Sequence, residues 1–257
     1  MSLIKKFLKL LLKHVINYLI LKKTFKVSKL IADAGICSRR KAELLIKEGK
    51  VKLNNKILTN IPERAALKDS IKGSNKKIKI IKKTRLWKYH KPTGKLTTNY
   101  DPLGRKTIFD ELPKTLPRVI SIGRLDFNSE GLLLLTNSGN FARYLELPKN
   151  SFSREYKVKI KGEINVEKLK NLKKGIKIKN VKYKKIKTTI LDKKKNYFWI
   201  KMKLTEGKNR EIRKIINFFG WNVLVLQRIS YGPILLDKLK KNEVEEINLN
   251  KYFKKIK

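Results

Sequence analysis

The sequence contains few of the residues that hold metal ions or form disulfides. Among its 257 residues are one cysteine, Cys37, and two histidines, His14 and His90. A lone cysteine excludes an intrachain disulfide and a cysteine-rich zinc site, and it gives no sign of an oxidising compartment. Two histidines far apart in the chain do not indicate a metal site or a Ser/His/Asp triad. We therefore expect a cytoplasmic protein without a metal site.

Acidic residues are also scarce, since 21 Asp and Glu oppose 65 Lys and Arg, for a formal net charge of +44. A positive field of this strength attracts polyanions in a salt-dependent way, so nucleic acid is the expected partner. A coding bias toward lysine explains part of the excess. Only 12 of the basic residues are arginines. Arginines that fall in motifs are therefore informative, because their planar guanidinium groups bind anions at two points.

The first 23 residues mix leucine and isoleucine with lysine. Lys5, Lys6, Lys9 and Lys13 interrupt any apolar run long enough to cross a membrane, so we expect no membrane span. No small-residue cleavage site follows the apolar stretch, which argues against a secretory signal. We expect a basic, apolar extension over residues 1–24; a membrane-surface or partner helix is the alternative.

A regular pattern begins at Phe25. Val27, Leu30 and Ile31 recur at helical spacing, and Ser38 is placed to cap a second helix, RRKAELLIKEGK. Residues 51–58 then predict a strand, a tight turn at an Asn-Asn pair and a second strand. Lysine-rich residues 68–83 predict a last strand followed by a linker.

The stretch KLIADAGICSRRKAELLIKEGKVKLNNK resembles the S-four-type RNA-binding domain, over about residues 25–81. With the linker, this small αβ module takes residues 25–83. Basic side chains at the start of a helix suit phosphate binding, although on spacing alone they would be ordinary solvated charges. The resemblance implies that RNA is contacted by Ser38, Arg39, Arg40, Lys41 and Lys50.

From residue 84 the chain alternates short strands with turns. Only residues 139–145 and 211–219 predict helices, so we expect an α+β domain with a mixed, largely antiparallel sheet over residues 84–240. A lysine-rich tail, residues 241–257, is expected to lie outside this domain. Asp126 follows an apolar strand in a polar loop, a position where aspartate is usually a turn former. No second carboxylate pairs with it, so glycosidase-like and two-metal chemistry gain no support.

Four motifs give this domain a specific resemblance. YHKPTG, GRLDFNSEGLLLLTN, REYKV and EGKNREIRKI follow the front module in the order found in bacterial ribosomal RNA pseudouridine synthases. The resemblance covers about residues 25–234. The stretch YHKPTGKLTTNYDPLGRKTIFDELP most resembles the large-subunit branch of this family, to which synthase B belongs. A pseudouridine synthase domain behind an RNA-binding module is therefore the expected architecture.

The resemblance implies an enzyme that converts uridine to pseudouridine in ribosomal RNA without any cofactor, and the branch resemblance favours RNA of the large subunit. Its catalytic residues would be Asp126, as the essential carboxylate, Tyr156 and Arg213. A carboxylate can attack or stabilise the reacting sugar if it stays ionised, which a neighbouring arginine favours. A phenol can stack on the uracil and assist removal of the C5 proton. Further RNA contacts would come from Arg124, Lys208, Asn209 and Arg210.

Two alternatives remain. A ribosome-associated RNA-binding protein without catalytic activity would also use the front module, but the intact motif residues argue against a decayed second domain. A hydrolase acting on RNA would need paired carboxylates or histidines that the motifs do not supply. We expect a monomer whose partner is ribosomal RNA.

Overall fold

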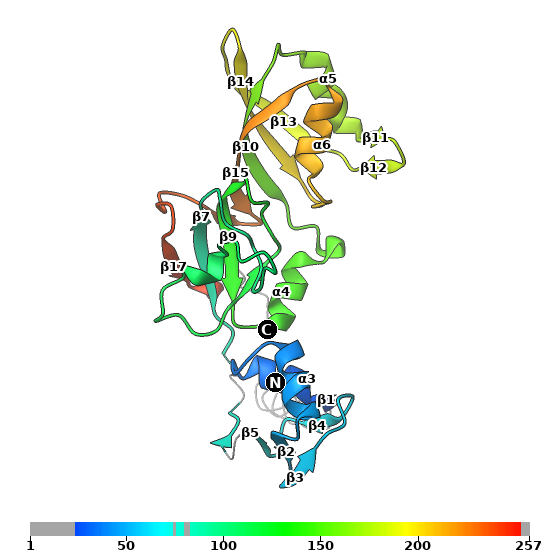
Figure 1. Ribbon diagram of the computed structural model, residues 1–257. Helices are drawn as coiled ribbons and strands as arrows, with labels where there is room; N and C mark the ends of the chain where they lie inside the picture. Colours follow the sequence, from blue (N-terminus) through cyan, green and yellow to red (C-terminus); the bar gives the residue numbers. More distant parts are fainter. Residues whose placement is uncertain (1–23, 74–75, 80–82, 253–257) are drawn as a thin grey trace, which may run out of the picture. The chain divides into compact units, whose positions relative to one another are not determined.

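The computed structural model describes residues 24–73, 76–79 and 83–252. The expected extension therefore lies outside the described residues, apart from Thr24, which begins a strand. The chain divides into two compact units between Lys83 and Thr84 (Figure 1). Each unit has a hydrophobic core of its own. No helix within the described ranges has the length and apolar character needed to cross a membrane.

The first unit packs two helices, α2 (Val27–Asp33) and α3 (Arg39–Lys47), against each other and against short strands. Its core includes Val27, Leu30 and Ile46, all at most 1% exposed. The predicted cap is confirmed, because Ser38 Oγ accepts a hydrogen bond from the Lys41 N–H at 3.2 Å. The predicted helix pair and the strand, turn and strand that follow it are also confirmed.

The strands of this unit form two small antiparallel sheets. One pairs β1 (Thr24–Lys26) with β4 (Arg64–Ala66). The other has the order β3-β2-β5-β6, with bounds Lys56–Leu58, Val51–Leu53, Ile71–Gly73 and Lys76–Lys77. The turn between β2 and β3 is made by Asn54 and Asn55, both at positive φ (48° and 69°), as a tight hairpin requires.

The second unit is built on a nine-stranded sheet within residues 84–252. Its main order is β13-β14-β10-β15-β9-β7-β17, with β16 paired to β15 and β8 to β9. All these pairings are antiparallel except that of β15 with β9, so the expected fold class is confirmed. The strands are β7 (Leu86–Lys91), β8 (Ile120–Ile122), β9 (Glu130–Thr136), β10 (Arg154–Lys161), β13 (Lys187–Lys193), β14 (Tyr197–Leu204), β15 (Asn222–Tyr231), β16 (Ile234–Leu235) and β17 (Val244–Ile247).

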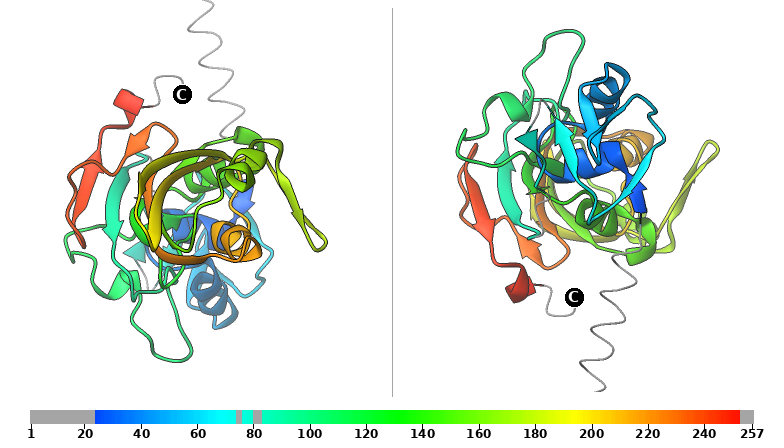
Figure 2. Two further views of the ribbon diagram at one scale, coloured as in Figure 1. Left: turned by 90° about the horizontal axis from the view of Figure 1, so that it is seen from above. Right: turned by 90° about the horizontal axis from the view of Figure 1, so that it is seen from below.

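Two helices of the second unit match the prediction, α4 (Gly139–Glu146) and α6 (Glu211–Phe218). Helix α6 buries its isoleucines against the core that β10 and β14 line, and these strands curve around it (Figure 2). A separate hairpin projects from the unit (Figure 2). Elements not predicted are α5 (Val166–Asn171), α7 (Leu249–Tyr252), the hairpin strands β11 (Ile176–Ile178) and β12 (Val181–Tyr183), and the short 3-10 turns Ile108–Asp110, Pro148–Asn150 and Leu172–Lys174.

The expected tail after residue 240 is partly wrong. Residues Val244–Ile247 form β17, which pairs antiparallel with β7, and Ile247 is buried against the second unit's core. Glu246 adds an ion pair with Arg85 at 2.5 Å. The sequence predicts the end of the domain too early because lysines dominate its composition and hide a short strand. Residues 253–257 lie outside the described residues.

Candidate active site

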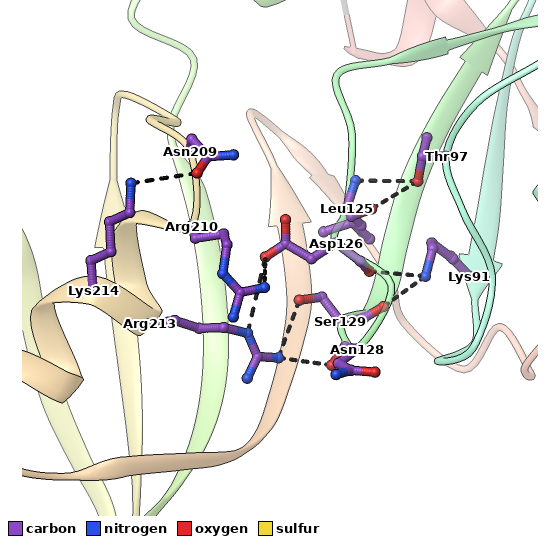
Figure 3. Close-up of polar contacts among 10 residues, drawn as sticks. All are labelled: Lys91, Thr97, Leu125, Asp126, Asn128, Ser129, Asn209, Arg210, Arg213 and Lys214. Atoms are coloured by element: carbon purple, nitrogen blue, oxygen red, sulfur yellow. Dashed lines mark hydrogen bonds and ion pairs between the residues drawn. The ribbon is translucent and has the colours of Figure 1, made fainter. Parts of the chain in front are cut away.

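Asp126 lies in the tight connection between β8 and β9. The Ser129 N–H donates to the Asp126 carbonyl at 3.0 Å and closes the turn. Lys91, at the end of β7, donates from Nζ to the carbonyls of Asp126 (3.2 Å) and Ser129 (2.9 Å) (Figure 3). Lys91 is fully buried, and burial lowers the pKa of its ammonium to about 8, an effect that the charge of Asp126 opposes. A buried lysine thus fixes the backbone of the turn.

The segment after β7 holds the other side of this turn. Thr97 Oγ1 donates to the carbonyl of Leu125 at 2.9 Å and accepts from its N–H at 3.3 Å (Figure 3). The Gly94 N–H donates to the carbonyl of Phe127 at 2.9 Å. Hydrogen bonds hold the backbone of the residues on both sides of Asp126. The position of its carboxylate is therefore fixed, as a reactive group requires.

Two arginines of the EGKNREIRKI motif approach the Asp126 carboxylate. Arg210 Nη1 lies 3.8 Å from Oδ2, and Arg213 Nε lies 4.0 Å from the same oxygen (Figure 3). Arg210 has a positive φ of 51° and precedes the first turn of α6, which directs its side chain toward the aspartate turn. The carboxylate, 32% exposed, therefore faces the cleft with a guanidinium pair beside it.

Arg213 connects helix α6 to the aspartate turn. Its Nη2 donates to the Asn128 carbonyl at 2.8 Å and to Ser129 Oγ at 3.4 Å. Its Nε is buried and has no hydrogen-bond partner within the described ranges. Burial lowers the pKa of the Arg213 guanidinium, Arg210 acts in the same direction and Asp126 opposes both. Arg213 is thus held by the backbone beside Asp126 and directs one N–H toward it.

Tyr156 joins this group from β10. Its side chain is 9% exposed and lines the same cavity as Asp126, so the structure brings close together residues that lie on separate motifs. The apolar part of the lining consists of Leu125, Leu204, Ile212 and Leu226, and the polar part includes Ser129, Arg154, Glu211 and Arg228. A small cavity with apolar walls and a few polar groups suits a flat heterocycle.

The residues expected to contact RNA near the site differ in their surroundings. Arg124 is exposed at the rim, and the ion pairs seen for Asp126 among the described residues come from Arg210 and Arg213 instead. Asn209 Oδ1 accepts from Lys214 Nζ at 3.4 Å. The Lys208 ammonium pairs with the Glu206 carboxylate at 3.2 Å and donates to a backbone carbonyl, so it is already engaged.

Four of the expected RNA-binding residues of the first unit lie at the start of α3, whereas Lys50 follows the other end of this helix. Arg39, Arg40 and Lys41 are exposed at the start of α3, directly after the Ser38 cap. Lys50 is exposed too, but its ammonium lies 2.7 Å from the Glu48 carboxylate. Side chains exposed beside the free N–H groups of a helix terminus can reach phosphate oxygens.

Two buried charged residues of the cavity were not predicted. Glu211 is 4% exposed and Arg228 is 2% exposed, and both line the cavity that contains Asp126 and Tyr156. Burial raises the pKa of the Glu211 carboxyl to about 7, which the Lys208 N–H bond opposes. An arginine within the apolar strand sequence VLVLQRIS was the available signal for Arg228. Among the described residues, no group of three or more His, Cys, Asp or Glu side chains is placed to hold a metal ion.

Comparisons with known proteins agree with this arrangement. The family profile of RNA pseudouridylate synthases matches residues 85–218, and that of the S4 domain matches residues 26–63. An uncharacterized RNA pseudouridine synthase of Rickettsia typhi is 45% identical over 232 residues, which cover 90% of this chain and 95% of that one. Ribosomal large subunit pseudouridine synthase B of Bacillus subtilis is 38% identical over 86% of this chain and 91% of its own.

A solved structure of a pseudouridylate synthase shares the fold, with a TM-score of 0.64 at 23% identity, over 89% of this chain and 98% of that chain. The synthase profile spans more than half of the sequence, and the relatives are similar along most of their length. Residues of the GRLDFNSEGLLLLTN, REYKV and EGKNREIRKI segments also meet around the Asp126 cavity. The protein therefore belongs to the RNA pseudouridine synthases, enzymes that isomerise uridine within RNA, and it carries an S4 domain ahead of the catalytic one.

Proposed function

We propose that this enzyme isomerises a uridine of large-subunit ribosomal RNA and that Asp126 is its essential catalytic group. The name of the Bacillus subtilis relative, ribosomal large subunit pseudouridine synthase B, supports this substrate. The observation that carries the catalytic assignment is the Asp126 carboxylate, held on a fixed turn at a small cavity with two arginines within 4.0 Å.

The reaction breaks the bond between the sugar C1′ and the uracil N1, rotates the base and joins C5 to the sugar. A carboxylate is suited to the first step, because it can attack the nucleotide or stabilise the electron-poor sugar. Asp126 lines the cavity, and Arg210 and Arg213 approach its Oδ2. The two guanidinium groups orient the carboxylate for this step.

Tyr156 has a different role in the proposal. Once C5 has bonded to the sugar, it carries a hydrogen that must leave as a proton to restore the aromatic ring. The Tyr156 side chain lies in the cavity wall, where its ring can stack on the uracil and its hydroxyl can assist that transfer. Tyr156 thus serves the second half of the reaction.

RNA must deliver the uridine as a flipped nucleotide, because the cavity admits a base and not a helix. Arg124, Asn209 and Arg210 line the wider cleft around Asp126, where cationic and amide groups can bind the flanking phosphates. Lys208 contributes chiefly by shaping this turn, since its ammonium is paired. The S4 domain adds Arg39, Arg40 and Lys41 as a second attachment, which raises the local concentration of RNA.

The test is pseudouridine mapping on unmodified ribosomal RNA incubated with the wild type and with Asp126→Asn, which keeps the size of the side chain. We expect one new pseudouridine in large-subunit RNA with the wild type and none with the variant, at RNA affinity within a few-fold. Asp192→Asn is the matched control, because the Asp192 carboxylate is exposed and its ion pair is weak, with Lys194 Nζ 4.0 Å from Oδ1.

Three other results would revise the proposal. Product formed by Asp126→Asn would contradict the catalytic assignment. A new pseudouridine in small-subunit RNA would show that the substrate is small-subunit RNA and not large-subunit RNA. Tight binding without product on either RNA would favour the RNA-binding protein without catalytic activity.

A further inference from the structure

The cavity beside Asp126 contains two buried polar groups that the reaction as described does not use. Glu211 Oε1 and Arg228 Nη2 are buried, and neither has a hydrogen-bond partner within the described part of the chain. Their side chains line one cavity. Native proteins pair nearly all buried donors and acceptors, so an unpaired carboxyl oxygen and an unpaired guanidinium nitrogen in one cavity point to a ligand that pairs with both.

Arg228 is placed by the sheet. On β15 it lies directly opposite Tyr156 of β10, and residues opposite each other on antiparallel strands project from the same face. Its Nε donates to the Leu132 carbonyl at 2.6 Å, which fixes the guanidinium plane and leaves Nη2 as a donor. Arg228 therefore presents an N–H beside the tyrosine that would stack on the base.

Glu211 is placed by the start of α6. Its Oε2 accepts a hydrogen bond from the Lys208 N–H at 2.9 Å, which fixes the orientation of the carboxyl. This contact leaves Oε1 as the unpaired atom. The charged groups that act on Glu211 are Glu206, Lys208 and Arg154, and the cavity also contains Asp126 and Arg228.

We propose that Arg228 and Glu211 recognise the edge of the target uracil, with Arg228 Nη2 donating to a ring carbonyl oxygen and Glu211 Oε1 accepting the N3–H. The inference rests on the proposed function. Uracil carries an N3–H flanked by two carbonyl oxygens, so it can pair with both the unpaired donor and the unpaired acceptor of this cavity. Cytosine has an acceptor at N3, and the Glu211 carboxylate, ionised above about pH 7, would repel that atom. The pair thus makes the cavity specific for uridine.

The decisive experiment combines a change in the enzyme with a change in the base. An RNA fragment containing the uridine that the wild type modifies is synthesised with either uridine or N3-methyluridine at that position. We expect the wild type to lose at least about tenfold in kcat/KM on the methylated substrate, because the N3–H contact is lost. Glu211→Ala should act more slowly on uridine but discriminate between the two substrates by less than about threefold.

Two further variants separate recognition from structure. Glu211→Asp keeps a charge at the helix start but shortens the reach, and should also lose discrimination; it replaces Glu211→Ala if that variant does not fold. Glu206→Gln is the matched control, since Glu206 is a buried glutamate of the same turn that pairs with Lys184 N–H and Lys208 and is not part of the cavity lining. It should discriminate as the wild type does.

The outcomes are distinguishable. Equal discrimination by the wild type, Glu211→Ala and Glu211→Asp would overturn the recognition of N3–H. Equal rates of all enzymes on both substrates would overturn it as well. Absence of any product from the wild type on unmethylated RNA would contradict the proposed function itself, and the recognition of uracil with it.

Discussion

Arg213 and Asp126 are joined by a direct and an indirect relationship. Arg213 Nε lies 4.0 Å from Asp126 Oδ2, and the Nη2 of the same guanidinium donates to the Asn128 carbonyl in the turn that carries Asp126. The Arg213 side chain therefore both pairs with the Asp126 carboxylate and stabilises the backbone of the turn that carries it. A lysine in its place could supply only a point charge, because an ammonium cannot reproduce this fork.

Arg213→Lys is accordingly expected to lower kcat by about a hundredfold to a thousandfold, the range found when one preorganised donor of an active site is removed. RNA affinity should stay within a few-fold, because Arg213 is largely buried and does not line the wider cleft around Asp126. Single-turnover kinetics on the mapped fragment measure the effect. Lys214→Arg, one residue along the same helix, is the control; a loss of equal size there would indicate a general disturbance of α6.

Much of this site follows from the sequence, for physical reasons that particular residues illustrate. Local patterns predict the elements around Asp126, Tyr156 and Arg213, namely apolar strands that end in a turn and a helix with arginines three positions apart, while the roles of these residues come from the resemblance of their motifs to the pseudouridine synthases. Ser38 is recognised by its place before a helical pattern, and the structure confirms that cap. Such features can be predicted from the sequence because they depend only on residues that are close together in the chain.

The missed features depend on distant parts of the chain. An arginine in the apolar strand VLVLQRIS stands out, but the sequence does not show that Arg228 points inward, because its burial arises from the pairing of β15 with β9 and β10. Glu211 reads as an ordinary first-turn glutamate until the cavity closes around it. The strands β11 and β12 alternate lysine with apolar residues in a lysine-rich background, so their pattern is hidden.

The backbones of β9 and β15 approach each other closely at Gly131. Gly131 has a φ of 104°, and a Cβ added there would lie 2.3 Å from the Arg228 carbonyl oxygen, at the parallel pairing of β9 with β15. Gly131→Ala should therefore destabilise the second unit by about 3 kcal/mol or more, since both the conformation and the space are wrong for a side chain. Urea unfolding measures this loss.

Gly104→Ala is the control for that experiment. Gly104 also has a positive φ, 66°, but an added Cβ would meet nothing within 4 Å. Gly104→Ala should lower the free energy of unfolding by about 1 kcal/mol, because only the unfavourable backbone conformation contributes. Equal costs at the two positions would show that the strand approach at Gly131 is not what limits substitution.

Glu211 predicts a pH dependence of stability. Its pKa is raised from 4.5 to about 7 by burial, so between these values the folded state binds more protons than the unfolded state. The free energy of unfolding should therefore fall as pH rises from about 4.5 to 7, by up to about 3 kcal/mol. Glu211→Gln cannot titrate and should not show this contribution.

Tryptophan fluorescence during urea unfolding reports this effect, because Trp87, Trp199 and Trp221 all lie in the second unit. The informative quantity is the difference in unfolding free energy between the wild type and Glu211→Gln at pH 5 and at pH 8. The variant should gain relative to the wild type at the higher pH. A difference that does not change with pH would show that Glu211 stays ionised in the folded protein.

The last prediction concerns the S4 domain. Arg39 and Arg40 are exposed at the start of α3, where phosphate oxygens can also meet free backbone N–H groups. Reversing both charges, with Arg39→Glu and Arg40→Glu, should weaken RNA binding and reduce the slope of log affinity against log salt by about 1 to 2, since each phosphate contact releases about one counterion. Lys56→Glu with Lys68→Glu changes the net charge equally at other exposed positions of the same unit and is the matched control. If both double variants shift the slope alike, the effect belongs to the overall charge of the domain, and α3 is not its RNA-binding surface.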